Sequence, residues 1–273
     1  MFKNCNKLNI KKITCKLTLL IFYLNKVKNI LSHYTYKRCL CLVSVGYINE
    51  QYIYIKNKKK YSKEFGVCVI HYNIRKNYLN SKLSVLFYYI NKISIINCTL
   101  LQLPLPIHLS FKNLSNIINC LKDIDKMTNK THFEACTPLA CAYLIYKESR
   151  CTKGKKTAFF GKSINVIKPL IKIFTTEKSI ITHFHSYSKN SMCKLECIDY
   201  LFVAIGHPEV INDKYLLGTK NIIDIGINYY HNRSICGDIR YKQVRSNAKR
   251  ITPVPKGIGI LTVSLLFYNV LIT

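Results

Sequence analysis

The chain has 273 residues, of which 49% are hydrophobic, so it is long and apolar enough for two ordinary cores and is not a disordered chain. Its formal net charge of +29 is typical of proteins that bind nucleic acid or anionic membranes. The basic residues are spread along the chain, with short clusters at residues 58–60 and 153–156 and no nucleic-acid-binding motif. We therefore expect no specific nucleic acid partner, because a diffuse positive field attracts small polyanions equally well.

The cysteines and histidines do not predict a metal site. None of the thirteen cysteines forms a Cys-x-x-Cys pair, which favours free thiols in a reducing compartment. His183 and His185 alternate around Phe184 as they would in a strand, so both could reach one metal ion. Without a convergent cysteine pair, we expect no metal there.

The first residues leave two interpretations open. Residues 1–12 are basic and residues 17–24 are apolar, a pattern typical of a cleaved leader for secretion or for an organelle. Residues 17–31 also have the spacing of an amphipathic first helix. The apolar block is too short to span a bilayer. We expect a cytoplasmic protein, or an organellar one (mitochondrion or plastid) if the segment is a leader.

The next segment predicts two strands around a helix. Residues 39–45 are apolar and end at Gly46, which indicates a buried strand. Residues 51–65 predict a helix that ends at Gly66, since glycine adopts the left-handed conformation of a helix C-terminus. Residues 68–74 predict the second strand.

Tyr52 and Lys56 form the first candidate site. Residues four apart lie on one face of a helix, so an aromatic ring and an amine could approach the same ligand. The alternative is a solvated helix face.

Gln102 is the second candidate. Residues 76–92 predict a helix and residues 94–101 a strand that places Gln102 at its carboxyl end, where α/β domains bind ligands. The Leu-Pro-Leu-Pro sequence of residues 103–106 stiffens the chain that follows. An ordinary strand with a proline-rich turn is the alternative.

A carboxylate follows the next predicted helix, residues 111–121. The sequence Lys-Asp-Ile-Asp at residues 122–125 ends in Asp125, whose two oxygens can accept hydrogen bonds from paired N–H groups of a ligand.

The second half of the chain predicts a phosphate-binding turn. Thr137 and Pro138 have the residue types of a helix N-cap and first position. Residues 155–160 predict a strand, residues 161–163 (Gly-Lys-Ser) a tight turn, and residues 166–174 a helix. A strand, a glycine turn and a helix N-terminus receive the phosphates of dinucleotides.

Three further apolar runs indicate a doubly wound sheet. They cover residues 179–184, 200–205 and 221–225 and are separated by loops or helices. Ser186 and Ile227 lie in the loops after two of them, at the ends of strands where a crevice forms. For Ser186, an ordinary turn residue is the alternative.

The last segments complete an ordered series of motifs. Residues 236–239 read Cys-Gly-Asp-Ile, residues 251–262 read Ile-Thr-Pro-Val-Pro-Lys-Gly-Ile-Gly-Ile-Leu-Thr, and residues 261–272 predict a final helix. With about 12 apolar residues against the roughly 20 that a span requires, this helix is not a membrane anchor. From residue 39 to residue 269, the ordered motifs resemble the bifunctional methylenetetrahydrofolate dehydrogenase/cyclohydrolase family.

The resemblance implies two α/β domains around a cleft, the second a Rossmann-like dinucleotide-binding domain. It implies a folate-binding catalytic domain at residues 1–136, in which residues 1–30 are a leader or first helix. An NAD(P)-binding domain follows at residues 137–253, and residues 254–273 form a motif and a helix that pack back on the first domain. Family members are commonly homodimers, which we expect here.

The resemblance also implies two reactions of one-carbon metabolism and purine biosynthesis. Methylenetetrahydrofolate gives a hydride to NADP, and the methenyl product is hydrolysed to formyltetrahydrofolate. Lys56 would transfer the proton in hydrolysis with a lowered pKa, Gln102 would hydrogen-bond Lys56, Tyr52 would stack on the folate, and Asp125 would hold the pterin. The remaining expected contacts are to the substrate, by Leu101, Leu103, Pro255, Gly257 and Gly259, and to the cofactor, by Gly161, Lys162, Ser163, Ser186 and Ile227.

Several residues depart from the family pattern. Lys126 and Lys256 stand where the family has glycine, so Lys126 would be strained if that position needs a positive φ. Ile167 replaces a second glycine of the phosphate turn, and Ile260 also differs. Lys162 replaces an arginine and favours NADP, although NAD stays open. A homologue that retains only the cyclohydrolase and, against the motif order, a basic nucleic-acid-binding protein are the alternative functions.

Overall fold

The structure is a computed structural model, and the residues that it describes fall into two compact units. The described residues are 38–46, 49–128, 130–149, 151–185, 197–216, 218, 221–230 and 234–273. The predicted leader or first helix at residues 1–31 lies outside them. One unit contains residues 38–136 and 263–273, and the other contains residues 137–262.

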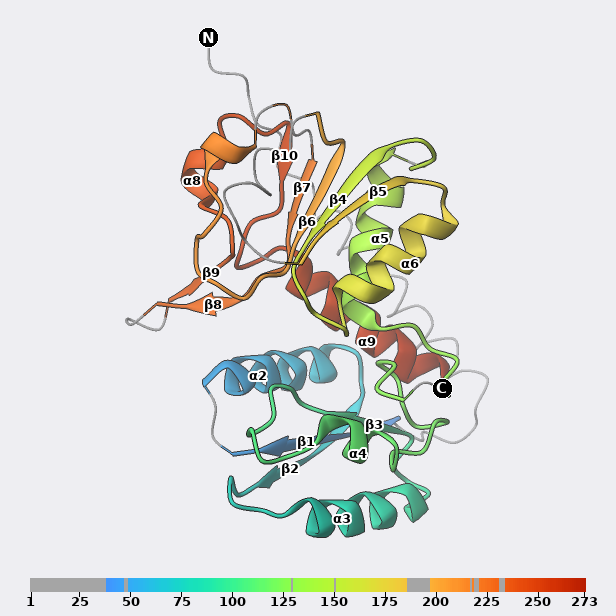
Figure 1. Ribbon diagram of the computed structural model, residues 1–273. Coiled ribbons are helices and arrows are strands. Elements are labelled where there is room, and N and C mark those ends of the chain that lie inside the picture. The colour runs from blue at the N-terminus through green and yellow to red at the C-terminus, as the bar shows by residue number, and fades with distance from the viewer. Residues whose placement is uncertain are drawn as a thin grey trace. The chain divides into compact units, whose positions relative to one another are not determined.

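The first unit is built on a three-stranded parallel sheet. Its strands are β1 (Cys39–Val45), β2 (Cys68–Ile74) and β3 (Cys98–Leu101), in the order β2-β1-β3. Helices α2 (Asn49–Glu64) and α3 (Asn80–Lys92) lie on opposite sides of this sheet (Figure 1). The parallel order brings the carboxyl ends of all three strands to one edge, where polar side chains follow apolar runs.

One face of this sheet holds the apolar core. Alternate residues of β1, including Cys41 and Val43, pack with Leu83, Phe87 and Ile90 of α3, and all five are fully buried. The short helix α4 (Phe111–Ser115) covers the same cluster through Leu114.

Helix α2 has one buried stripe. Its buried residues recur every three or four positions, as expected for a helix that faces a core along one side. They are Gln51, Ile55, Lys58 and Ser62, and Phe65 just after the helix continues the same line. Gly66, at φ 66°, ends the helix, and the Val67 N–H donates to the Ser62 carbonyl, so the predicted glycine C-terminus is confirmed.

The end of helix α9 (Ile258–Ile272) belongs to the first unit. Phe267 packs on Phe65 with ring centroids 5.5 Å apart, and Asn269 Nδ2 donates to the Ile124 carbonyl at 2.9 Å. The final helix is therefore longer than predicted, and its last turns pack on the first unit.

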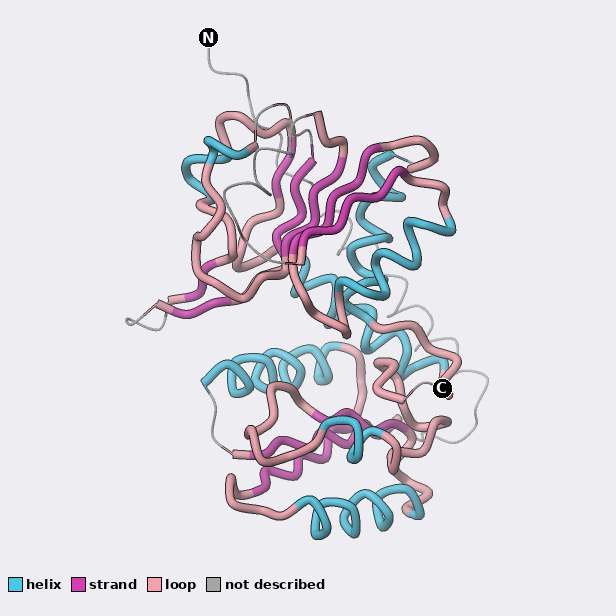
Figure 2. The backbone as a smooth tube through the Cα atoms, in the orientation of Figure 1, coloured by secondary structure: helices cyan, strands magenta, loops and turns pink. Residues whose placement is uncertain are grey.

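The second unit contains a five-stranded parallel sheet, and Figure 2 shows its strands side by side. Its strand order is β10-β7-β6-β4-β5, which reverses at β4, the place where open α/β sheets bind ligands. The strands are β4 (Lys156–Phe160), β5 (Ile180–Phe184), β6 (Tyr200–Val203), β7 (Asn221–Asp224) and β10 (Arg250–Ile251). The mixed α/β fold with a doubly wound second unit is thereby confirmed.

Other elements of the second unit surround this sheet. They are helices α5 (Cys136–Ser149), α6 (Ile167–Thr176) and α8 (Tyr241–Val244), the 3-10 helix η1 (Asp213–Tyr215), and the hairpin of β8 (Asn228–Tyr229) and β9 (Ile235–Cys236). Helices α5 and α6 lie beside β4 and β5 (Figure 1). Helix α5 starts at Cys136, so Thr137 is its second residue and the predicted N-cap at Thr137 is wrong.

Several predicted bounds need correction. The strands at residues 39–45 and 68–74 are confirmed, because apolar runs ending at a turn define them clearly. Helix α3 starts at Asn80 instead of residue 76, β3 starts at Cys98 instead of residue 94, and α4 ends at Ser115 instead of residue 121.

Every cysteine in the described part of the chain is a free thiol, as expected. None of the helices there combines the length and apolar content that crossing a bilayer requires.

Lys126 and Lys256 adopt a conformation that normally suits glycine. Lys126 has φ 52° and Lys256 has φ 73°, both in the left-handed region, so the expectation of strain at Lys126 is confirmed. Lys126 also forms a 2.7 Å ion pair with Glu134, whereas Lys256 is exposed and has no ion pair among the described residues.

We predict that Lys256→Gly stabilises the chain. Glycine adopts a positive φ without steric strain, and we expect a gain of about 0.5–1 kcal/mol after its larger unfolded-state entropy is subtracted. Urea unfolding measures the change. Lys153→Gly is the matched control, since Lys153 is exposed in a turn of the same unit without a positive φ and should lose stability. Equal losses in both variants would contradict the prediction.

Candidate active site

The first unit buries a lysine against a glutamine at the edge of its sheet. Lys58 lies on the buried stripe of α2 and is 9% exposed. Its Nζ donates to Gln102 Oε1 at 2.6 Å. An amine in this position has lost most of its water and has one oriented acceptor.

The backbone fixes Gln102 at the end of β3. Its N–H donates to the Val43 carbonyl at 2.8 Å, which continues the pairing of β3 with β1. Its side-chain Nε2 donates to the Leu103 carbonyl at 2.8 Å, and Gln51 Nε2 donates to the carbonyls of Gln102 and Pro104. The side-chain oxygen of Gln102 is therefore turned toward Lys58 by bonds on the opposite side of the amide.

Asp125 lies near the same amine. Its Oδ1 accepts a 2.7 Å hydrogen bond from the Cys136 N–H, at the first residue of α5. A carboxylate at a helix N-terminus is stabilised by the unpaired N–H groups there. The Cys136 side chain also interacts with this carboxylate, and only Oδ1 accepts from the Cys136 N–H, so Oδ2 keeps a lone pair for a ligand.

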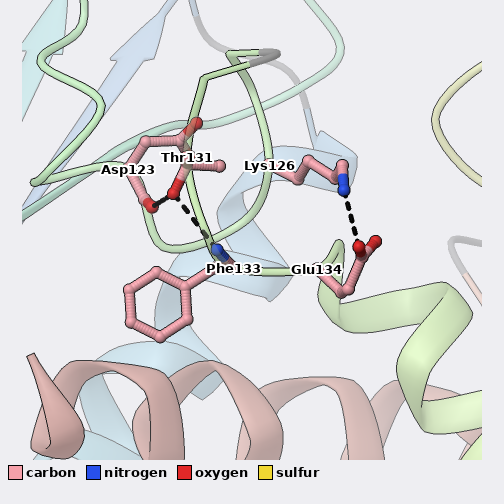
Figure 3. A network of polar contacts seen from close by, with 5 residues as sticks. All are labelled: Asp123, Lys126, Thr131, Phe133 and Glu134. Carbon is pink, nitrogen blue, oxygen red and sulfur yellow. Dashed lines mark hydrogen bonds and ion pairs between the residues drawn. The ribbon is translucent and has the colours of Figure 1, made fainter.

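Asp123 holds the loop that presents Asp125. Its carboxylate is fully buried and accepts from the N–H groups of Asp125, Met127 and Thr128 at 3.2, 3.1 and 2.7 Å. Figure 3 shows the far side of the loop, where Thr131 Oγ1 donates to the Asp123 carbonyl at 2.7 Å. Sequence reasoning placed Asp123 in a motif but missed this positioning function, for which the fixed spacing from Asp125 was the available signal.

Burial and neighbouring charges shift the pKa values of Lys58 and Asp125 in opposite directions. Burial lowers the pKa of the Lys58 amine to about 8, although the charges of Asp125 and Cys136 act to raise it. Burial also raises the pKa of Asp125, and the Cys136 N–H and the charge of Lys58 act to lower it. At neutral pH a useful fraction of Lys58 is therefore the neutral amine, which can accept a proton.

The prediction that Gln102 hydrogen-bonds Lys56 is wrong, because Lys58 is the partner. Lys56 is exposed, and Tyr52 is 53% exposed. The sequence contains two overlapping Tyr-x-x-x-Lys pairs, and the second, Tyr54 with Lys58, has the buried lysine.

The buried stripe of α2 could have distinguished the two pairs. Positions 55, 58, 62 and 65 continue at helical spacing, and position 56 falls off this line.

The second unit places the predicted phosphate turn at the reversal point of its sheet. Gly161 follows β4 with φ 134°, and a Cβ there would lie 2.1 Å from the Ala204 carbonyl oxygen at the end of β6. Only glycine allows this approach of two strand ends. His183 Nε2 is hydrogen-bonded to the Gly161 carbonyl at 2.9 Å, which gives His183 a structural partner.

The turn leads to the N-terminus of α6 as predicted. Lys162 is exposed, and the Ser163 carbonyl accepts from the Ile167 N–H at 2.9 Å. Ile167 is 1% exposed, and its Cγ1 would lie 3.4 Å from a Cβ at Gly161, so its side chain packs beside the turn. Ile227 is half-buried and follows Gly226 after β7, whereas Ser186 lies outside the described residues.

Two buried carboxylates hold the loops on this side of the sheet. Asp238 is fully buried and accepts from the N–H groups of Ile205, Gly206 and His207 at 2.6–3.1 Å. Asp224 accepts from the Ile239 N–H at 3.0 Å, and burial followed by the charge of Asp238 raises its pKa to about 8.

Glycine is required beside both carboxylates. A Cβ at Gly226 would lie 2.2 Å from the Asp238 carboxyl carbon, and one at Gly237 would lie 1.9 Å from Asp224 Oδ2. The sequence motif at residues 236–239 therefore has a structural function in fixing the loops after β6 and β7.

The other residues expected to contact the substrate belong partly to the first unit and partly to the second. Leu101 is buried in the core at the end of β3, and Leu103 is half-buried beside Gln102. Pro255, Gly257 and Gly259 belong to the second unit, at the turn into α9 and in its first turn. A Cβ at Gly257 would lie 2.1 Å from the Pro253 carbonyl oxygen, so this turn also requires glycine. In the described ranges, no group of three or more side chains is arranged to hold a metal ion.

We predict that Lys58→Met stabilises the chain at pH 7 by about 1–2 kcal/mol. Methionine has a similar shape without a buried charge, and this gain exceeds the loss of the hydrogen-bond donor to Gln102. Since the native pKa is about 8 and the ordinary value is 10.5, the unfolded chain binds more protons between these values. The free energy of unfolding of the wild type therefore rises with pH across this window, and the advantage of the variant declines.

Urea unfolding of both proteins from pH 7 to pH 10.5 measures this difference. A difference that stays constant with pH would show that Lys58 has an ordinary pKa in the folded chain.

The comparisons with known proteins agree with this arrangement. The catalytic domain of tetrahydrofolate dehydrogenase/cyclohydrolase matches residues 7–125, and the NAD(P)-binding domain of the same enzymes matches residues 135–273. A curated relative, "Bifunctional protein FolD" of Agathobacter rectalis, is 30% identical over 240 residues, which are 85% of this chain and 86% of that protein.

Solved structures share the fold. The bifunctional FolD enzyme of Campylobacter jejuni superposes with a TM-score of 0.87 at 24% identity, over 97% of each chain. The Trypanosoma brucei enzyme, solved with NADP and an inhibitor, gives 0.84 at 22% identity over 96% of this chain and 93% of that one. Two matched domains in the right order, together with a relative of near full length, show that the chain belongs to the tetrahydrofolate dehydrogenase/cyclohydrolase family.

Proposed function

We propose that this chain carries out both reactions of its family, with Lys58 as the group that transfers the proton in the cyclohydrolase step. The reactions are the NADP-dependent oxidation of methylenetetrahydrofolate to methenyltetrahydrofolate and the hydrolysis of that product to formyltetrahydrofolate. The 2.6 Å hydrogen bond between the buried Lys58 amine and Gln102 carries the proposal.

Lys58 has the properties that hydrolysis demands. A group that takes a proton from water near neutral pH works best with a pKa close to that pH, and burial lowers the pKa of Lys58 to about 8. Gln102 accepts a hydrogen bond from the amine without adding a charge, so it orients Nζ and leaves the lowered pKa in place.

Asp125 and Tyr54 are our candidates for holding the folate. Oδ1 of Asp125 is engaged by the Cys136 N–H, which fixes the carboxylate and leaves Oδ2 to accept from a pterin N–H. Tyr54 is half-buried one turn before Lys58, and we assign it the stacking function first given to Tyr52. Leu103, Pro255, Gly257 and Gly259 stay candidates for contacts with the rest of the folate.

The cofactor proposal rests on the turn after β4. Gly161 allows the close approach of strand ends, the N-terminus of α6 follows, and Lys162 between them is exposed. These features fit a dinucleotide phosphate. The exposed Lys162 supplies a positive charge for a 2'-phosphate and favours NADP, which the solved Trypanosoma brucei relative binds. When bound, the nicotinamide accepts the hydride, and the protein contributes positioning.

We further propose a catalytic domain at residues 1–136, a cofactor domain at residues 137–253, and a C-terminal segment at residues 254–273. The two matched family domains, residues 7–125 and 135–273, support this division. A homodimer in the cytoplasm is our proposal for assembly and compartment.

We predict that Lys58→Gln lowers the rate of methenyltetrahydrofolate hydrolysis by about 100-fold or more, because the proton-transferring amine is replaced by an amide. Lys56→Gln is the matched control, since Lys56 lies two residues away on the same helix and is exposed. Its rate should equal that of the wild type. The decay of methenyltetrahydrofolate absorbance measures both rates.

The oxidation of methylenetetrahydrofolate, offered with NADP and with NAD, shows in the same preparations that the folate site is folded. A loss of hydrolysis in Lys56→Gln with full activity in Lys58→Gln would contradict the assignment of Lys58. Failure of oxidation with either cofactor in the wild type would contradict the dehydrogenase function.

A further inference from the structure

The first unit contains a cavity of about 330 Å³ that the proposed reactions do not use. It lies between α2 and the carboxyl ends of β1 and β2, and its lining includes Ser44 and His71 from the strands. Ligands of α/β sheets bind at this kind of edge, and the volume is at the lower end of the range for small-molecule sites. Lys58, Gln102 and Asp125 do not line it.

Three neutral polar side chains of β1 and β2 line the cavity: Ser44, His71 and Asn73. Ser44 is buried, and its Oγ lies 2.8 Å from His71 Nε2 and donates to Asn73 Oδ1 at 3.3 Å. Burial, followed by the charge of Lys59, lowers the pKa of His71, so its ring is neutral at pH 7. Asn73 Nδ2 has no partner among the described residues, and its N–H groups can donate to a ligand oxygen.

The cavity lining carries positive charge. Lys56 and Lys59 both line it, one turn apart on α2, and both are exposed. The ion pairs within the described ranges are Lys126–Glu134 and Arg250–Glu148, so these two ammonium groups lack carboxylate partners there. Among the residues that the structure describes, no Asp or Glu lines the cavity. Such a lining repels cations and attracts anions.

Part of the cavity lining is apolar. Ile55, which is 7% exposed, and the aromatic side chain of Tyr52 both line the cavity. A bare inorganic anion would leave these apolar groups uncovered, whereas a planar organic body can pack against an aromatic ring.

Gln51 separates this cavity from Lys58. It lines the cavity, is 2% exposed, and donates to the Gln102 carbonyl. Its Oε1 is buried without a hydrogen-bond partner in the described part of the chain. A ligand in the cavity would therefore contact a side chain that is bonded to the residue holding Lys58.

We propose that this cavity binds a small planar organic carboxylate, with the carboxylate between Lys56 and Lys59 and the flat body against Tyr52 and Ile55. The Tyr52–Lys56 pair that the sequence singled out thus serves a second site and not the proton transfer. The site is separate from the proposed folate contacts, so it stands or fails independently of the proposed function.

Benzoate is the probe for this site, and isothermal titration calorimetry with the full chain measures its binding. We expect saturable binding that is about tenfold weaker in the double variant Lys56→Gln/Lys59→Gln, because two charged donors are lost. Lys60→Gln is the matched control on the same helix, does not line the cavity, and should bind benzoate like the wild type. Benzamide, which lacks the charge, and acetate, which lacks the ring, should both bind more weakly than benzoate.

A second titration, in the presence of saturating tetrahydrofolate, tests where benzoate binds. We expect benzoate to bind the folate-loaded chain as well, since the residues proposed for folate do not line the cavity. Displacement of benzoate by tetrahydrofolate, equal binding to the double variant, or no saturable binding to the wild type would each overturn the proposal. Acetate binding as tightly as benzoate would also overturn it.

Discussion

The buried hydrogen bond between Lys58 and Gln102 is the interaction on which the catalytic unit depends. A lysine is seldom buried without a carboxylate in direct contact, because removing its charge from water is costly. Here the amine has an uncharged acceptor at 2.6 Å, and Asp125 acts on it through its charge while bonded to the N-terminus of α5. Desolvation without a direct ion pair is what lowers the pKa into the range useful for proton transfer.

The rest of the first unit holds Lys58 and Gln102 in contact. The stripe of α2 carries Lys58 inward between Ile55 and Ser62, and the pairing of β3 with β1 fixes Gln102. The second unit also has a buried, hydrogen-bonded polar side chain at its strand ends. There Asp238 accepts from three successive N–H groups, and a glycine leaves room beside it. In both units, buried polar groups with satisfied partners set the loops where chemistry is proposed.

The sequence was sufficient for the elements that local pattern determines. Apolar runs that end at glycine, such as residues 39–45, gave correct strand bounds, and the ordered motifs identified the family. It was insufficient where distant contacts decide. Asn80 begins α3 while its side chain accepts from the Ser110 N–H, and Asn97 accepts from the Cys39 N–H just before β3. These partners are separated by about 30 and 58 residues, so no local window contains them.

The choice between Lys56 and Lys58 shows the same limit within one helix. Both lysines follow a tyrosine by four residues, and spacing alone cannot rank the pairs. Burial ranks them, because the stripe that includes Ile55 and Phe65 passes through position 58. Lys126 and Lys256, in addition, have a positive φ that normally suits glycine, which the residue type alone does not indicate.

The most direct test of this account is an NMR titration of the lysine side chains in protein labelled with ¹³C-lysine. The Cε resonance of Lys58 is identified as the one that is absent from the spectrum of Lys58→Gln. We predict that this resonance titrates near pH 8, well below the ordinary value of 10.5. Titration at the ordinary value would show that the amine is solvated, and it would contradict a buried Lys58 held by Gln102 as the proton-transferring group.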